Sequence, residues 1–518
     1  MLIHKPSKSV VLRVKDPERI QRVIPKSRML DWDGHNLAVR HGIDETRVLR
    51  NLGIMVPSPI RYYYDWPGDK RPFAHQKLTS EFATLPKRLF ILNEMGTAKT
   101  RAVIWAIDYL IKVGAVRRAL VIAPLSTLTH VWEQEVFATT MHRTTVNLHA
   151  HSYEARLKRL ERPADIYIAN HHAVNVIGTE LRARKDIDLV VWDESSELRN
   201  PATDMYKNFK AMLRPDQRLW LVSGAPCPNA PSDAWAQVRL VNPEGVSPYF
   251  THFRRATMMK VSEHRWVPRA GSAELVHAAM QPAIRFRKAD CIDLPPVLQE
   301  DRVCDMTKAQ KDMYQSMRAQ MIADSASKRL VAVNAADQIN KLRQILCGAV
   351  KVADGDYDPI DHKPRLQLLL DCIAEAAAKV VVVVPFKGIV RLLEQEISPH
   401  YTCGMINGDV PVKERNDIIT RFKNTDSPHV LLCHPKVMSH GLNLTEADML
   451  IFYAPIYSND QYLQVLERLN RPGQKRRMTT VRIGANPLEW KIYKALDGKG
   501  ITQSNILDLY QQEIAEAA

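Results

Sequence analysis

Short runs of β-branched and other apolar residues alternate with longer helical patterns from about residue 71 onward. Strands that are buried on both faces of a parallel sheet give such runs, and helices between them cover the two faces. A first set of runs predicts strands at residues 89–92, 119–123, 166–169, 189–192 and 219–223. A second set predicts strands at residues 380–384, 403–406, 429–433, 449–453 and 479–483. The pattern therefore predicts an α/β protein with two doubly wound parallel sheets.

The length of 518 residues exceeds what one hydrophobic core supports, and the patterns divide the chain into four parts. Residues 1–70 are mixed and basic and predict a small N-terminal accessory domain, in which Tyr62 to Tyr64 either steer DNA or pack on the first sheet. Residues 71–290 form the first large domain and residues 361–518 the second. Residues 291–360 between them predict a helical connector, in which residues 301–348 are expected to be helical.

Two predicted strands of the first domain end in residues that suit a nucleoside triphosphate. The run at 189–192 stops at Asp193 and Glu194, and a buried strand rarely ends in adjacent acids without a cation or a reaction to serve. The run at 89–92 leads into Met95-Gly96-Thr97-Ala98-Lys99-Thr100, before a helical pattern. A strand-to-helix loop binds phosphates with its backbone N–H groups and the helix N-terminus. The sequence thus predicts an ATP-binding site.

The four charged or hydroxyl side chains at these strand ends have distinct predicted roles. Lys99 reaches the β- and γ-phosphates, and the hydroxyl of Thr100 binds Mg2+. Asp193 holds the same magnesium ion, while Glu194 polarises the attacking water. ATP and Mg2+ are therefore the expected cofactors.

The loop departs from the strict phosphate-loop pattern G-x-x-x-x-G-K-[ST], because Asn93 and Ala98 stand at its two glycine positions. If Ala98 adopts a backbone conformation that favours glycine, we expect a cost of about 1 kcal/mol or more. An ordinary strand-to-helix turn is the alternative for this segment taken alone. Its combination with Asp193 and Glu194 favours the nucleotide site.

Charge adds a polyanionic partner to this picture. The chain has 72 Lys and Arg against 57 Asp and Glu, a net charge of +15, which favours nucleic acid, although such proteins are often simply basic. Its seven cysteines are scattered and form no Cys-x-x-Cys, which argues against zinc ribbons and disulfides and for a reducing compartment. Without a membrane-length apolar run or a signal peptide, we expect an intracellular protein with no membrane partner. A monomer is compatible with the sequence.

A set of segments follows in order along the chain: Phe73-Ala74-His75-Gln76, Asn93-Glu94-Met95-Gly96-Thr97-Ala98-Lys99-Thr100, Val121-Ile122-Ala123-Pro124-Leu125-Ser126-Thr127-Leu128, Asp193-Glu194-Ser195-Ser196, Ser223-Gly224-Ala225-Pro226, His440-Gly441-Leu442-Asn443-Leu444-Thr445 and Gln464 to Gln474. This set resembles the motifs of the Swi/Snf-type ATPases of helicase superfamily two. The resemblance spans about residues 71–490. It implies two tandem RecA-like domains and movement on double-stranded DNA.

The resemblance also assigns residues by position. Gln76 is expected to recognise adenine. A further set of residues is expected either to contact DNA or to couple ATP hydrolysis to DNA binding: Pro124, Ser126, Thr127, Ser223, Gly224, Gly441, Asn443, Thr445 and Gln464. Two departures from the family pattern fall near these positions: Ser195-Ser196 replaces the usual Ala-His, and His440 replaces a glycine.

Gln464, Arg468 and Arg471 are spaced at i, i+4 and i+7, which on a helix places them on one face. The resemblance assigns the two guanidinium groups the role of arginine fingers, which stabilise charge during phosphoryl transfer. A solvated basic helix face is the alternative for such a pair taken alone.

The leading interpretation is a DNA-stimulated ATPase that moves on duplex DNA in replication, recombination or repair. The compact core favours a bacterial or phage protein. One alternative is an RNA or single-strand helicase. Another is a nucleic-acid-binding scaffold with a degenerate site, which Ala98 would mark.

Overall fold

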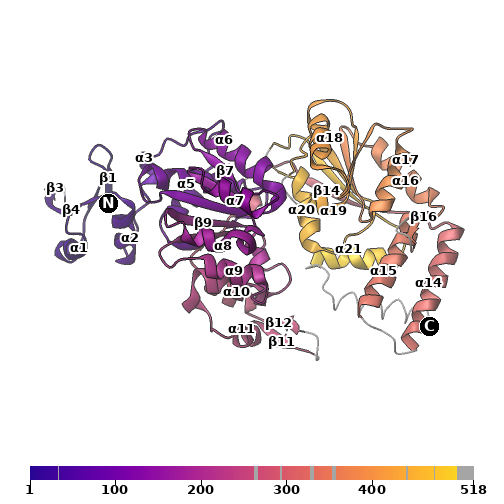
Figure 1. Ribbon diagram of the computed structural model, residues 1–518, viewed down its shortest axis with the longest axis horizontal. Coiled ribbons are helices and arrows are strands. Elements are labelled where there is room, and N and C mark those ends of the chain that lie inside the picture. Colours follow the sequence, from indigo (N-terminus) through magenta and orange to yellow (C-terminus); the bar gives the residue numbers. More distant parts are fainter. Residues whose placement is uncertain are drawn as a thin grey trace. The chain divides into compact units, whose positions relative to one another are not determined.

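The five predicted strands of the first large domain belong to one seven-stranded sheet in the computed structural model (Figure 1). Across this sheet the order is β13 (Ala283–Ile284), β5 (Arg88–Ile91), β10 (Arg218–Val222), β9 (Ile187–Asp193), β6 (Arg118–Ala123), β8 (Ile166–Asn170) and β7 (Thr145–Asn147). Every neighbouring pair is parallel. All carboxyl ends of the strands therefore lie at one edge of the sheet.

The structure describes most of the chain, with short gaps. The described residues are 1–32, 34–261, 266–291, 294–326, 332–352, 357–438, 442–471 and 473–498. The chain divides into two units, of which the first is Met1–Met259 with Val267–Ile292 and the second is Lys260–Trp266 with Asp293–Ala518.

Helices cover both faces of the first sheet, because alternate strand residues point to opposite sides. On β5, Leu89 and Ile91 pack in a core with Val103 and Ile107, while Phe90 packs in the other core. The helices of this domain are α4 (Ala74–Thr84), α5 (Lys99–Lys112), α6 (Gln134–Thr140), α7 (Tyr153–Leu160), α8 (Ala173–Ala183), α9 (Asp204–Met212), α10 (Ala234–Val241), α11 (Phe250–Thr257) and α12 (Ser272–Ala279). A hairpin of β11 (Met258–Lys260) and β12 (Trp266–Pro268) precedes α12.

The second unit has a six-stranded sheet that is also entirely parallel. Its order is β14 (Val297–Val303), β21 (Met478–Gly484), β20 (Ala447–Phe452), β17 (Lys379–Val383), β19 (Val430–Cys433) and β18 (Cys403–Ile406). The helices are α14 (Lys308–Ala326), α15 (Ala332–Cys347), α16 (Lys363–Ala374), α17 (Lys387–Ile397), α18 (Val412–Asn424), α19 (Pro435–Met438), α20 (Asn459–Leu469) and α21 (Pro487–Gly498). The predicted class, two parallel-sheet α/β domains, is confirmed.

The segment that suggested a helical connector, residues 291–360, folds into the second unit. Its residues 297–303 form the edge strand β14, so the helical prediction was wrong at residues 301–303. Helices α14 and α15 contribute Tyr314 and Leu342 to the core of that unit. The strands β15 (Ala349–Lys351) and β16 (Tyr357–Pro359) complete this segment as a small antiparallel pair.

The N-terminal residues form a four-stranded antiparallel sheet with two helices (Figure 1). The strand order is β1 (Leu2–His4), β2 (Ser9–Leu12), β4 (His35–Arg40) and β3 (Arg28–Trp32), with α1 (Pro17–Val23) and α2 (Ile43–Asn51). A separate small core unites them. After the short helix α3 (Ile60–Tyr63), Tyr64 is only 6% exposed, and its hydroxyl donates a 2.5 Å hydrogen bond to Asp108. Tyr64 therefore packs on the first sheet.

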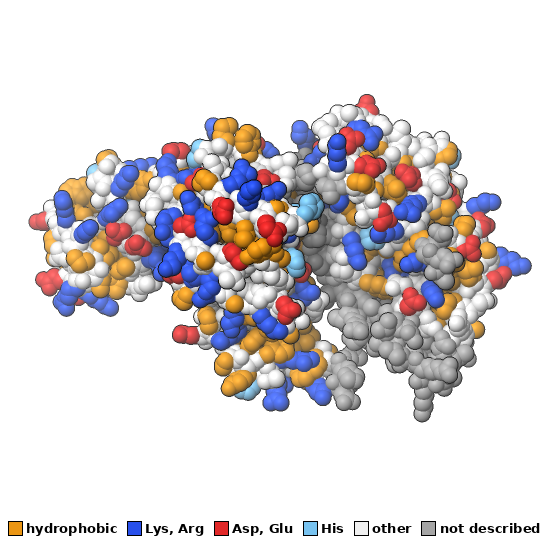
Figure 2. Space-filling model, viewed as in Figure 1, with side chains coloured by type: hydrophobic (Ala, Val, Ile, Leu, Met, Phe, Trp, Pro, Cys, Tyr) orange, Lys and Arg blue, Asp and Glu red, His pale blue; other side chains and the backbone are white. Residues whose placement is uncertain are grey.

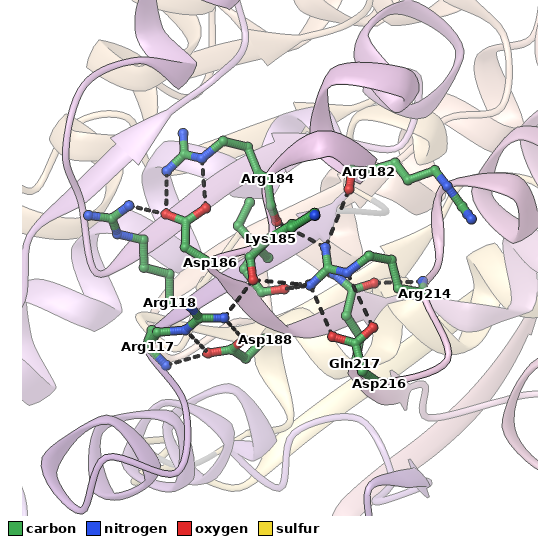
Figure 3. Close-up of polar contacts among 11 residues, drawn as sticks. Arg117, Arg118, Arg182, Arg184, Lys185, Asp186, Asp188, Arg214, Asp216 and Gln217 are labelled. Atoms are coloured by element: carbon green, nitrogen blue, oxygen red, sulfur yellow. Dashed lines mark hydrogen bonds and ion pairs between the residues drawn. The ribbon is translucent and has the colours of Figure 1, made fainter.

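Arginine and aspartate side chains form a network at the amino ends of β6 and β9 (Figure 3). Arg117 donates 2.9 and 2.7 Å hydrogen bonds to the two carboxylate oxygens of Asp188. Arg184 contacts both oxygens of Asp186 at 2.8 Å, and Arg118 binds the same carboxylate. These hydrogen bonds hold the pKa of Asp186 well below its usual range. Several arginines are thus committed to the edge opposite the carboxyl ends of the strands.

None of the helices in the described ranges is both long and apolar enough to span a lipid bilayer.

Candidate functional site

The predicted phosphate loop lies between the carboxyl end of β5 and the first residue of α5, Lys99. Gly96 has φ +79°, and Ala98, which immediately precedes the helix, has φ +54° and ψ +41°. Ala98 therefore adopts the left-handed conformation that favours glycine. For a residue with a Cβ atom this conformation costs about 1–2 kcal/mol. Strain of this kind persists where the surrounding structure enforces it.

Helix α4 contacts the phosphate loop through two buried side chains. The ring N–H of His75 donates a 2.8 Å hydrogen bond to the carbonyl of Thr97. The side-chain amide of Gln76 donates to the carbonyl of Ala98 at 3.0 Å and accepts from the N–H of Phe73 at 2.9 Å. Gln76 is only 2% exposed, and these two hydrogen bonds leave one N–H and one oxygen lone pair of its side-chain amide for a further partner.

Asn93, at the first glycine position of the pattern, is fully buried and functions through its side-chain amide. It donates a 2.8 Å hydrogen bond to Thr79 of α4 and accepts one of 3.1 Å from the N–H of Phe286. The next residue, Glu94, accepts a 3.0 Å hydrogen bond from the N–H of Lys288. The phosphate loop is therefore fixed both to α4 and to the segment that ends the first unit.

Asp193 and Glu194 lie at the carboxyl end of β9, at the same edge of the sheet. Asp193 pairs with Val222 of β10, and Val222 pairs with Ile91 of β5. Two strand spacings, about 10 Å, therefore separate the end of β9 from that of β5. Glu194 has φ +55°, the second non-glycine residue of the site in the left-handed region. The two carboxylates thus lie at the end of β9, which β10 separates from the strand that leads into the phosphate loop.

Two side chains from other segments contact Asp193. The indole N–H of Trp132, which is fully buried, donates a 3.0 Å hydrogen bond to the Asp193 carboxylate. The ring of His171 donates a 2.8 Å hydrogen bond to the Asp193 carbonyl and stacks on Trp192 at 4.7 Å. The N–H of Glu194 binds the other carboxylate oxygen at 3.1 Å.

The oxygen donors at this edge suit Mg2+. Thr100 offers a hydroxyl and Asp193 a carboxylate, and Mg2+ is commonly held by one or two such protein groups together with substrate phosphates and water. Within the residues that the structure describes, no cluster of three or more His, Cys, Asp or Glu side chains forms a complete metal site. The hydroxyl of Thr100 and the carboxylate of Asp193 are oxygen donors of the kind that fit a magnesium ion bound to nucleotide phosphates.

Ser223 and Gly224 follow β10 and lie directly beside the phosphate loop. Ser223 is fully buried, and its N–H binds the carbonyl of Ile91 at 3.1 Å. A Cβ atom on Gly224 would lie 2.9 Å from Cγ and 3.1 Å from the backbone nitrogen of Met95. The close approach of the two loops therefore requires glycine at position 224.

Gln237 of α10 connects the loops after β9 and β10. Its side-chain oxygen accepts a 2.8 Å hydrogen bond from the hydroxyl of Ser195, and its amide donates to the carbonyl of Pro226 at 2.7 Å. Ser195 therefore has a defined partner, although it departs from the family pattern. Sequence reasoning missed Gln237, because a single polar residue in an apolar helix gives no signal of a distant partner.

The loop after β6 contains Pro124, Ser126 and Thr127, three of the residues expected to contact DNA or to couple ATP hydrolysis to it. Pro124 and Thr127 are buried, and the Thr127 hydroxyl donates to the Pro124 carbonyl at 2.8 Å. Ser126 is exposed, as is Leu125 at 53%. Ser126 is thus the predicted residue whose side chain is free to meet a DNA backbone, while Thr127 shapes the loop.

In the second unit, the predicted coupling residues lie after β19 and on α20. Gln464 is 4% exposed, and Asn443 and Thr445 are half-buried. The N–H of Leu444 binds the carbonyl of Arg468 at 3.0 Å. The structure therefore brings the predicted segments of this unit together. Gly441, with His440 before it, lies outside the described residues.

The prediction that one helix face holds both arginines was wrong for Arg471. Helix α20 ends at Leu469, and Asn470 has the non-helical angles φ −84° and ψ +76°. Arg471 is followed in the sequence by Pro472, and the residue before a proline is disfavoured in a helix. Arg471 instead donates a 2.9 Å hydrogen bond to the carbonyl of Leu442. Arg468 remains on the helix, four residues after Gln464.

Two parallel-sheet domains, a phosphate loop on one of them, and an Asp-Glu pair at a nearby strand end define the class of helicase-like ATPases. The family model of the SNF2-related domain matches residues 84–349, just over half of the chain. The model of the helicase conserved C-terminal domain matches residues 364–473. The chain belongs to the SNF2-related family.

Individual relatives agree with this assignment. The chain is 23% identical to the transcription regulatory protein SNF2 of Saccharomyces cerevisiae over 79% of its own length and 26% of that protein. It is 22% identical to the DNA repair and recombination protein RAD54-like of Drosophila erecta over 80% of its length and 59% of that protein. An uncharacterized ATP-dependent helicase MG018 of Mycoplasma genitalium is 24% identical over 79% of the chain and 39% of that protein. The chain thus spans only part of each relative's length.

Among solved structures, the Sulfolobus solfataricus SWI2/SNF2 ATPase core in complex with dsDNA is 20% identical, with a TM-score of 0.42. That alignment covers 87% of this chain and 98% of the other.

Proposed function

We propose that this chain hydrolyses Mg-ATP and couples hydrolysis to movement on double-stranded DNA, in replication, recombination or repair. The observation that carries the proposal is the position of Lys99-Thr100 and Asp193-Glu194 at one edge of one sheet, with Ile91, Val222 and Asp193 in register. These two segments, far apart in sequence, are the two halves of the nucleotide site in this proposal. If the segment before α5 were an ordinary strand-to-helix turn, no pair of carboxylates at the same edge of the sheet would be expected.

The side chains at this edge divide the work of hydrolysis. The Lys99 ammonium, at the N-terminus of α5, binds the β- and γ-phosphates together with the loop N–H groups. Thr100 and Asp193 would hold Mg2+, which neutralises charge on the phosphates when bound. Glu194 accepts a proton from the attacking water and orients it. We assign Arg468 and Arg471 of the second unit to stabilising charge on the transferred phosphoryl group.

DNA as the partner has support from charge and from the relatives. The net charge is +15, and Lys and Arg side chains are spread over the visible surface of the first unit (Figure 2). The names of the relatives refer to transcription and to DNA repair and recombination. A polyanion bound to such a surface releases counterions, so its binding must weaken as salt rises.

The proposal is tested by ATP turnover with no nucleic acid, duplex DNA, single-stranded DNA and RNA at one fixed salt concentration. We expect duplex DNA to give the greatest stimulation, and Lys99→Ala to abolish it. The matched control is Lys112→Ala at the far end of the same helix, where the lysine is exposed and pairs with Asp65. Greater stimulation by RNA or single strands would favour the alternative helicase. Turnover that no nucleic acid changes would remove DNA from the proposal.

A further inference from the structure

Trp132 reaches the Asp193 carboxylate from an unusual turn of helix. The loop after β6 forms a short 3-10 helix, η1 (Leu125–Thr127), and continues as a π-helix, η2 (Leu128–Glu133), before α6 begins. π-helical turns are rare and occur often at functional sites. Trp132 lies in this turn, and its indole N–H is 3.0 Å from Asp193 Oδ2.

The loop that contains Trp132 has one exposed end and one buried end. Leu125 and Ser126 are exposed to solvent, whereas Trp132 is fully buried. Trp132 follows Leu125 by seven residues and Ser126 by six. The proposed DNA-facing surface and the predicted magnesium carboxylate are therefore joined by one short, continuously helical segment. The hydrogen bond from Trp132 is the contact through which a ligand on η1 would reach the Asp193 carboxylate.

The loop after β8 repeats this arrangement on the neighbouring strand. His172 is exposed, while His171 beside it binds the Asp193 carbonyl at 2.8 Å. The rings of His171 and Trp192 are nearly parallel, with 1° between their planes. Each of these two adjacent loops thus has a solvent-exposed residue and a side chain that contacts Asp193.

We propose that Trp132 is a positioning residue through which a DNA backbone on the Leu125–Thr127 loop changes the affinity of the Asp193 site for Mg2+. The inference rests on the proposed function, since it requires that the chain binds DNA. The indole N–H binds Oδ2 and the Glu194 N–H binds Oδ1, so the two hydrogen bonds together fix the direction in which the carboxylate oxygens offer their remaining lone pairs to the ion. Groups that orient a metal ligand typically change metal affinity or activity by about 10–100-fold when removed.

The sharpest test replaces the tryptophan at position 132 with 3-benzothienylalanine. This residue keeps the shape of the indole and has sulfur in place of the N–H. Trp132→Phe serves as the genetically encoded counterpart. Binding of a non-hydrolysable ATP analogue is measured by calorimetry across a range of Mg2+ concentrations, with and without duplex DNA. The readout is binding, which does not depend on turnover.

We expect both variants to need about tenfold more Mg2+ for half-maximal effect on nucleotide binding, with binding in EDTA unchanged. In the unaltered protein, duplex DNA lowers the Mg2+ requirement by about fivefold or more. In both variants this difference disappears. By reciprocity, Mg-nucleotide will also stop changing their affinity for DNA.

Two other buried tryptophans supply matched controls. Trp220→Phe removes the same volume from the neighbouring part of the sheet, and its indole N–H has no hydrogen-bond partner among the described residues. Trp105→Phe removes an indole N–H that donates a 2.8 Å hydrogen bond to Pro67, away from Asp193. Neither variant is expected to change the Mg2+ requirement or its response to DNA.

The outcomes separate this inference from the function beneath it. If the benzothienyl variant matches the unaltered protein while duplex DNA still stimulates ATP turnover, the role of Trp132 is refuted and the proposed function stands. The inference is equally refuted if the control variants shift the Mg2+ requirement as much as the Trp132 variants. If duplex DNA stimulates no turnover in the unaltered protein, the proposed function itself fails.

Discussion

Replacing Ala98 by glycine tests whether the phosphate loop stores backbone strain. Ala98 has φ +54° and ψ +41°, immediately before the first residue of α5. Glycine adopts these angles freely because it has no Cβ atom. In ordinary helical positions the same substitution destabilises a protein. The sign of the effect at position 98 therefore reports the conformation of the loop.

The magnitude follows from two opposing terms. Relief of the left-handed alanine contributes about 1–2 kcal/mol to the free energy of unfolding. The greater freedom of glycine in the unfolded chain offsets about 0.4–1 kcal/mol of this. The net stabilisation is about 0.5–1 kcal/mol, or about 2 °C in the melting temperature of a domain of this size. Affinity for ATP is not expected to rise, because alanine already holds the loop in its binding conformation.

Thermal unfolding without nucleotide measures the change in stability of Ala98→Gly, and calorimetric titration with ATP measures its affinity for ATP. Ala102→Gly is the matched control, since Ala102 is fully buried in the interior of the same helix. The free energy of unfolding of this variant should fall by about 1–2 kcal/mol, because glycine has a lower helix propensity than alanine and a buried methyl group is removed. If Ala98→Gly lowers the melting temperature as Ala102→Gly does, the loop does not hold the left-handed conformation and the reasoning is wrong.

Three further substitutions test the site, the core and the pH dependence. In Gly224→Ala the new Cβ atom would lie 2.9 Å from Cγ and 3.1 Å from the backbone nitrogen of Met95, which belongs to the phosphate loop. Overpacking of this kind costs about 1–3 kcal/mol, so the affinity for a fluorescent nucleotide should fall about fivefold or more. Glu489→Gln leaves Arg365, its fully buried partner at 2.7 Å, uncompensated, and denaturant unfolding of the second unit should show a loss of about 3–5 kcal/mol. Burial alone would raise the pKa of Asp108, but three side-chain hydrogen bonds outweigh it and hold the pKa below its ordinary 3.8. Its stabilisation is therefore present above about pH 4 and lost as the pH falls through the folded-state pKa, so Asp108→Asn should flatten the acid limb of melting temperature against pH.

Each of these expectations has a control or a contrary result. Gly178→Ala introduces a Cβ atom with nothing within 4 Å, so it should leave nucleotide binding unchanged. A Glu489→Gln variant as stable as the unaltered protein would show that the buried pair is dispensable. If the melting temperature of Asp108→Asn falls with decreasing pH as it does in the unaltered protein, acid unfolding is due to other carboxylates.

The central strands could be predicted from sequence because each is an apolar, β-branched run buried on both faces. The run at 380–384, for example, forms β17 at Lys379–Val383. The edge strand β14 was missed, since its sequence, Val-Leu-Gln-Glu-Asp-Arg-Val, is mostly exposed and charged and resembles a helix start. Strands of two or three residues, such as β13 and β7, are too short to give a pattern.

The chemical groups of the site were predictable, but the groups that position them were not. Lys99 and Thr100 begin α5, while Asp193 ends β9 and Glu194 follows it, and local patterns identify such positions. The hydrogen bond from Trp132 to Asp193 joins residues 61 positions apart in the chain, and no local pattern encodes it. The end of α20 before Arg471 could have been predicted, because the proline at position 472 disfavours a helix there.

The most direct test of the central claim is phosphate release by Glu194→Gln in a single turnover with saturating duplex DNA. A general base contributes about 10²–10⁴-fold to such a reaction, so release should slow by about 100-fold or more while ATP binding persists. Glu197→Gln, at an exposed position in the next turn, is the matched control and should release phosphate normally. If Glu194→Gln releases phosphate as fast as the unaltered protein, the edge of the sheet at Asp193 and Glu194 is not the site of hydrolysis.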